Sequence, residues 1–164
     1  MWNQAWESFR PFFLWCNETW IGQTVRESKW TFAIVEVVHL LGLTILLGSL
    51  LVLYLRLAGL AMRSQSIEHV ARQFAPWTAF GLSVMVMSGG TLFLAEAVKC
   101  LESGPFRIKM ALFFPAVLFH FGLYRKVIRV QEEHFDPMLG KLAGAFAGTL
   151  WLAVGIAGRW IAFY

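Results

Sequence analysis

The apolar run at residues 30–57, WTFAIVEVVHLLGLTILLGSLLVLYLRL, constrains this chain more than any other stretch. It exceeds the ~20 residues that a helix needs to cross the hydrocarbon core of a bilayer. Three more apolar runs follow, and we expect spans at about 30–57, 73–98, 106–126 and 140–162. Lipid offers no partner to an unpaired backbone group, so these runs must be helices. Short connections make sequential helices antiparallel. The predicted fold class is therefore all-α integral membrane, with an up-and-down four-helix transmembrane bundle in residues 30–164.

The composition agrees with a protein embedded in the lipid bilayer. Hydrophobic residues make up 58% of the chain and charged residues 15%, well below the ~25% charged residues of soluble domains. Lysines and arginines lie at the ends of the apolar runs, which suits anchoring at lipid headgroups and argues against a nucleic-acid partner. Lysines and arginines divide evenly between the two sides of the predicted membrane domain, whereas an excess would mark the cytoplasmic side. If some of those on the side of the termini bind a ligand, the balance places the other side in the cytoplasm. The N- and C-termini would then face the periplasm from a bacterial inner (cell) membrane.

Residues 1–29 have a different pattern, with aromatic side chains at intervals of three and four. This spacing predicts an interfacial amphipathic segment in the headgroup plane, interrupted near Pro11, and Ser28 is expected to cap the first span. The segment lacks a basic region followed by an apolar core and a cleavage site, so the first span is expected to act as the insertion signal. Cys16 and Cys100 have no haem-attachment spacing, so any haem would be non-covalent. A disulfide between them stays open.

The first span holds two ionisable residues, Glu36 and His39, on one helical face. Such groups are costly at membrane depth and indicate a functional site. A further histidine, His120, lies in the third run. His39 follows Lys29 by ten residues and His120 follows Lys109 by eleven, so at ~1.5 Å per residue the two imidazoles would share one level if the lysines mark equal depths. The first and third helices of such a bundle are diagonal neighbours. We therefore predict that His39 and His120 ligate the iron of one haem b.

Neighbouring residues fit the same hypothesis. Gly42, one turn after His39, leaves room for a porphyrin, as does Ala116 before His120. Cations expected near the haem propionates are Lys109, Arg159 and Arg107. Glu36 would either form an ion pair with Arg159 or Lys109, or serve proton or quinone chemistry.

Glycines recur in the fourth run at Gly140, Gly144 and Gly148. Two readings are compatible with such a face. It can pack against another helix, within the bundle or in a homodimer or larger complex, or it can form a flat groove for a cofactor, with Gly148 in contact.

Three stretches, ESKWTFAIVEVVHLLGLTILLGSLLVLYLRL, PFRIKMALFFPAVLFH and GRWIAFY, resemble an uncharacterised bacterial family of small four-span membrane proteins. The plan of a histidine in span one and a basic residue before a histidine in span three is similar to that of copper-resistance D membrane proteins and of haem-binding membrane protoporphyrinogen oxidases. The resemblance implies functional positions at His39, Lys109 and His120.

The leading functional hypothesis is a b-type cytochrome that transfers electrons between a quinone and a redox protein. One alternative is a copper-handling protein using Met85 and Met87 with the two histidines, although residues two apart point to different helical faces. A porphyrin-oxidising enzyme and a cofactor-free assembly subunit are two others. His69 and His134 are expected to be solvated in loops.

Overall fold

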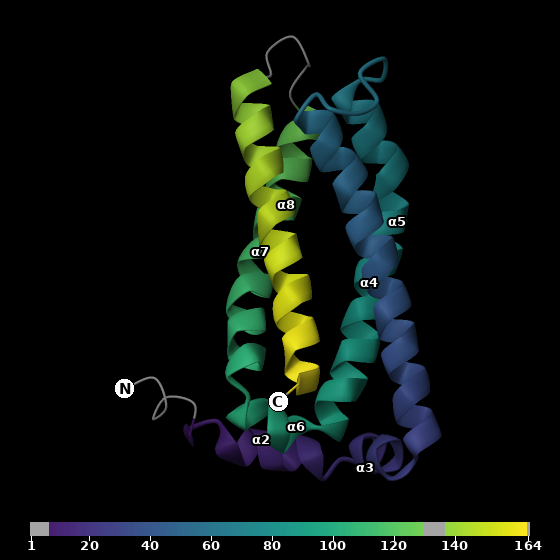
Figure 1. Ribbon diagram of the computed structural model, residues 1–164, viewed down its shortest axis with the longest axis vertical. Coiled ribbons are helices and arrows are strands. Elements are labelled where there is room, and N and C mark those ends of the chain that lie inside the picture. Colours follow the sequence, from purple (N-terminus) through teal and green to yellow (C-terminus); the bar gives the residue numbers. More distant parts are fainter. Residues whose placement is uncertain (1–6, 130–136, 164) are drawn as a thin grey trace.

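The computed structural model describes residues 7–129 and 137–163, and it is built around four long helices (Figure 1). They are α4 (Lys29–Leu57), α5 (Ile67–Ala95), α7 (Gly104–Arg129) and α8 (Pro137–Trp160). Each is long and apolar enough to cross a membrane. They run alternately up and down, and the described residues contain no strand. The predicted all-α four-helix membrane bundle is confirmed. His134 lies outside the described residues.

Capping side chains set where the helices begin. The Ser28 hydroxyl accepts a hydrogen bond from the Thr31 N–H at 3.2 Å, which confirms Ser28 as the cap of α4. Ser66 caps α5 in the same way, so α5 starts before the apolar run and ends at Ala95, earlier than the predicted 73–98 span. Hydropathy detects the part of a helix that lies in lipid. The ends of the helix depend on the side chains that form hydrogen bonds with its free backbone N–H and C=O groups.

Two short helices, α2 (Arg10–Asn17) and α3 (Trp20–Glu27), lie across the end of the bundle where α4 begins and α8 ends (Figure 1). We call them the belt. A turn at residues 8 and 9 precedes α2, and Pro11 lies in the first turn of that helix, where a missing N–H costs nothing, so the predicted interruption near Pro11 is confirmed. A second break comes at Thr19, which caps α3. Trp15 and Trp20 are exposed on the belt, as expected for a segment in the headgroup region.

A third short helix, α6 (Ala97–Glu102), connects α5 to α7 and packs against the belt. Phe13 and Cys16 of α2 form a buried cluster with Ala97, Cys100 and Leu101 of α6. Arg26 of α3 donates a hydrogen bond to the Ala95 carbonyl oxygen at 3.0 Å. The belt is thus attached to the end of α5 and to α6.

Glycines allow α4 to approach both of its neighbours. A Cβ atom on Gly81 of α5 would lie 2.7 Å from the backbone nitrogen of Leu46. On α8, a Cβ on Gly144 would lie 2.9 Å from the Tyr54 carbonyl oxygen. Gly140 is buried too. The glycine face of α8 therefore packs within the chain.

Candidate functional site

His120 is buried in the middle of the bundle, with 6% of its surface exposed. Its Nδ1 lies 3.1 Å from the Tyr54 hydroxyl, so α7 and α4 meet here across the bundle diagonal. The Tyr124 ring is stacked beside the imidazole at a centroid distance of 6.4 Å. A phenol donates more readily than it accepts, so we assign the shared proton to Tyr54 and the ring proton of His120 to Nε2. Nε2 has no hydrogen-bond partner among the described residues.

A cavity of about 170 Å³ adjoins His120 between α4, α5 and α7. Its walls are mostly apolar, and its polar side chains are His120, Tyr124 and Thr78. The Thr78 hydroxyl is already engaged with Ser49 and with the Phe74 carbonyl oxygen. The imidazole of His120 and the hydroxyl of Tyr124 are therefore the groups left to bind a ligand there.

The cavity reaches the lipid-facing surface of the bundle. Ala79 of α5 and Phe121 of α7 both line it, and both are exposed on the outside. Ala71, Ala75 and Ala79 recur at four-residue spacing along the wall that α5 contributes. Their small side chains leave the cavity unfilled, and a ligand can enter it from the bilayer between α5 and α7.

His39 lies in a separate site between α4 and α5. Its Nδ1 is 2.9 Å from the Ser88 hydroxyl oxygen, and a Cβ on Gly89 would lie 3.0 Å from its Cε1. Because the Ser88 hydroxyl donates to the Val84 carbonyl oxygen, it accepts from His39. This assigns the ring proton to Nδ1 and leaves a lone pair on Nε2.

The structure does not bring His39 and His120 together. His120 meets α4 at Tyr54, which follows His39 by fifteen residues, a rise of ~22 Å along the helix. One iron ligated by both imidazoles would need both nitrogens at the same level. The residues present do not fit a single haem between them in this arrangement.

The premise of equal depth for Lys29 and Lys109 is wrong. The side chain of Lys109 lies against Gly158 of α8, while Gly155, one turn away, faces Leu47 of α4. Lys109 is therefore level with residues 43 and 44 of α4, about four turns beyond Lys29. Counting residues from the two lysines gave a common level for the histidines only because it ignored this offset.

Residues 12–164 match a family of unknown function, DUF6644. The chain belongs to this family. No curated protein and no solved structure matches it. The match covers all four long helices, so the His120 cavity and the His39 site both lie within the family region of this DUF6644 protein.

The spaces expected for a porphyrin are filled by protein. A Cβ on Gly42 would lie 2.7 Å from Cγ1 of Val84, and Gly148 faces the Tyr54 ring. Ala116 is buried in the main apolar core. These positions serve contacts between helices.

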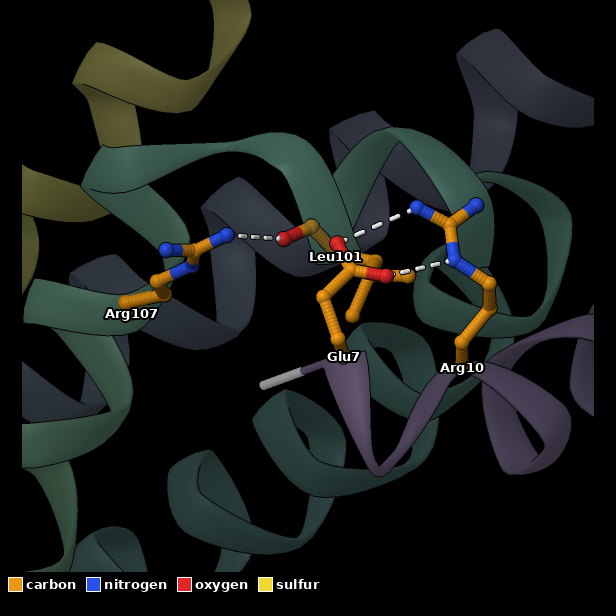
Figure 2. A network of polar contacts seen from close by, with 4 residues as sticks. All are labelled: Glu7, Arg10, Leu101 and Arg107. Atoms are coloured by element: carbon orange, nitrogen blue, oxygen red, sulfur yellow. Dashed lines mark hydrogen bonds and ion pairs between the residues drawn. The ribbon is translucent and has the colours of Figure 1, made fainter. Parts of the chain in front are cut away.

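The predicted cations have separate roles. Arg159 lies 3.9 Å from Glu36, an ion-pair distance that agrees with one of the two interpretations of Glu36. Arg107 donates to the Leu101 carbonyl oxygen at 2.8 Å, close to where Glu7 and Arg10 pair at the belt (Figure 2). Lys109 has neither contact.

The described residues contain no group of three or more His, Cys, Asp or Glu side chains that could hold a metal ion. Met85 is buried and Met87 is 75% exposed, so they lie on different faces as their spacing predicted. Cys16 and Cys100 are buried free thiols, not a disulfide. His69 is exposed as predicted, but it lies in the first turn of α5 and not in a loop.

Tyr54, Ser88 and the α5 wall of the cavity were not among the site residues predicted from the sequence. Hydropathy shows that a span is buried in lipid, but it does not show which residues face one another. One usable signal was present in the four-residue alanine spacing at Ala71, Ala75 and Ala79. On a helix such spacing leaves a smooth strip along one face.

Proposed function

We propose that this protein is a membrane redox protein that binds the head group of an isoprenoid quinone in the cavity beside His120. The observation that carries the proposal is a buried histidine, held by Tyr54, next to an apolar cavity that reaches the lipid. A site of this kind, apolar with few placed polar groups, is typical of small-molecule binding. A quinone is a flat apolar ring with carbonyl oxygens, and its tail would lie in the bilayer outside Ala79. The proposal sets the protein in a bacterial inner membrane with its termini in the periplasm.

The volume of the cavity supports a single ring. At about 170 Å³ it resembles an apolar cavity of ~150 Å³ that takes up benzene. Sites for larger ligands occupy ~300–1,000 Å³. The cavity volume is therefore of the order that a one-ring head group needs.

The chemistry follows from the assigned tautomer of His120. Its Nε2–H would donate to a quinone carbonyl oxygen, and that hydrogen bond strengthens as electrons from a redox partner place negative charge on the oxygen. Tyr54 holds the imidazole so that this proton faces the cavity. The Tyr124 ring supplies a flat surface beside the head group.

Binding of a short-chain quinone to the protein in mild detergent tests the proposal, with quenching of tryptophan fluorescence as the readout. Losing one hydrogen bond in an apolar site costs ~1–3 kcal/mol, so His120→Ala should weaken binding about ten-fold or more. His69→Ala, at an exposed position on α5, should bind as the wild type does. Equal affinity in both variants would contradict the proposal.

A second candidate is the b-type cytochrome, with haem b held by His39 and His120. In its favour, Nδ1 of each histidine meets a hydroxyl, Ser88 or Tyr54, and metal-ligating histidines are commonly oriented through their second nitrogen. Against it stands the difference in level, which α7 would have to remove by sliding along α4. Visible absorption spectra distinguish the two candidates. Reduced b-type bands that disappear in His39→Ala and His120→Ala would favour the cytochrome. A colourless wild-type protein would exclude the cytochrome and leave the quinone site as the remaining candidate.

A further inference from the structure

Trp151 of α8 carries a polar group that is buried without a hydrogen-bond partner. Only 3% of its surface is exposed, and its indole Nε1–H forms no hydrogen bond within the described residues. A buried tryptophan N–H usually has an acceptor, because leaving such a donor unpaired costs free energy. Among the donors that stay unpaired in protein cores are those with a redox or catalytic role.

The contacts of Tyr54 with α8 show what lies beside Trp151. The carbonyl oxygen of Tyr54 lies against Gly144, and its ring lies against Gly148, one turn nearer the belt. The hydroxyl is at the far end of that ring, so it lies farther in the same direction. Trp151 follows Gly148 by three residues, on the same face of α8. The Tyr54 hydroxyl is therefore level with Trp151.

The indole N–H of Trp151 faces an oxygen that can accept it. It is close enough to act on the Tyr54 hydroxyl oxygen, although the two groups do not yet have the geometry of a hydrogen bond. That hydroxyl donates to Nδ1 of His120, and its oxygen keeps lone pairs that can accept a hydrogen bond. Hydrogen bonds at functional sites are often long without the ligand and tighten when it binds. The Trp151 N–H is thus placed to complete a hydrogen bond with Tyr54.

We infer that Trp151 is a positioning residue of the His120 site, and that it begins a chain of donors directed at the bound quinone. The Trp151 N–H donates to the Tyr54 oxygen, and the Tyr54 O–H donates to Nδ1 of His120. The Nε2–H of His120 donates to the quinone carbonyl oxygen. Each hydrogen bond in such a chain polarises the next. The inference rests on the proposed function, because it requires a quinone beside His120.

A chain of this kind stabilises the reduced quinone more than the oxidised form. The oxygen of the neutral quinone is uncharged, whereas the radical anion formed with one electron from the redox partner carries negative charge. Hydrogen bonds to a charged oxygen are roughly twice as strong as those to a neutral one. Removing the Trp151 N–H should therefore weaken the hold on the radical anion selectively. Lost packing of the indole would instead weaken both forms alike.

Trp151→Phe tests this difference with a short-chain benzoquinone. Binding of the oxidised quinone, measured by calorimetry, should stay within about two-fold of the wild type, because the hydrogen bond of His120 remains. The stability constant of the bound radical anion, measured by electron paramagnetic resonance during a redox titration, should fall about three-fold or more. Trp160→Phe, at an exposed position on the same helix, is the matched control and should behave as the wild type does.

The outcomes separate this inference from the quinone site itself. Quinone binding with equal radical-anion stability in the wild type and Trp151→Phe overturns the inference and leaves the quinone site standing. An equal loss of both forms, or a wild type that stabilises no radical anion, overturns it too. A wild type that binds no quinone overturns the proposed function together with the inference. If Trp151→Phe fails to fold, replacing Trp151 by benzothienylalanine exchanges the N–H for sulfur in a ring of nearly the same shape, and the same selective loss is expected.

Discussion

At the scale of single residues, Tyr54 joins packing to the candidate site. Its hydroxyl meets Nδ1 of His120, its ring faces Gly148, and its carbonyl oxygen lies beside Gly144. One residue, through its main chain and its side chain, therefore contributes both to the close approach of α4 to α8 and to the orientation of the buried imidazole.

Replacing Tyr54 by phenylalanine separates these two roles. The ring stays packed, but Nδ1 of the buried His120 loses its partner, a cost of ~1–3 kcal/mol. We expect a lower unfolding temperature in detergent and a several-fold weaker quinone affinity. Tyr124→Phe is the control for stability, because the Tyr124 hydroxyl has no hydrogen bond among the described residues. Equal stability of the two variants would contradict the role of Tyr54.

At the scale of helices, small residues and caps determine how the spans meet. The number and type of the helices could be predicted from apolar run length, because lipid leaves a chain few alternatives. Their relative heights could not. The level of His120 depends on the start of α7 after α6 and on the contact of Lys109 with Gly158. Neither hydropathy nor residue spacing within one helix contains that information.

The contact between α4 and α5 gives a prediction at this scale. Gly81→Ala would place a methyl group against the backbone of Leu46, and overpacking of this kind costs ~1–3 kcal/mol. Gly48→Ala is the matched control on α4, since a Cβ there meets nothing within 4 Å. Replacing this helical glycine should stabilise by ~0.5–1 kcal/mol. Unfolding in detergent measures both, and a Gly81→Ala protein as stable as Gly48→Ala would contradict the packing.

At the scale of the whole molecule, the described chain separates two regions. The half of the bundle nearer the belt holds His39 and the Glu36–Arg159 pair, whereas His120 and its cavity lie farther along the bundle, and the cavity opens between α5 and α7. The sequence indicated both histidines as functional candidates and placed them in one site. The contacts of His39 with Ser88 and of His120 with Tyr54 place the two histidines in two separate sites.

Photolabelling with an azido-quinone in the lipid-embedded protein tests the quinone site most directly. We predict adducts confined to the cavity walls, at Leu53 of α4 and within residues 71–82 of α5 and 120–124 of α7. Unlabelled quinone should suppress them by competition, and Ala79→Leu, which narrows the mouth, should reduce them. Adducts spread over other helices, or labelling that excess quinone does not suppress, would contradict a quinone site beside His120.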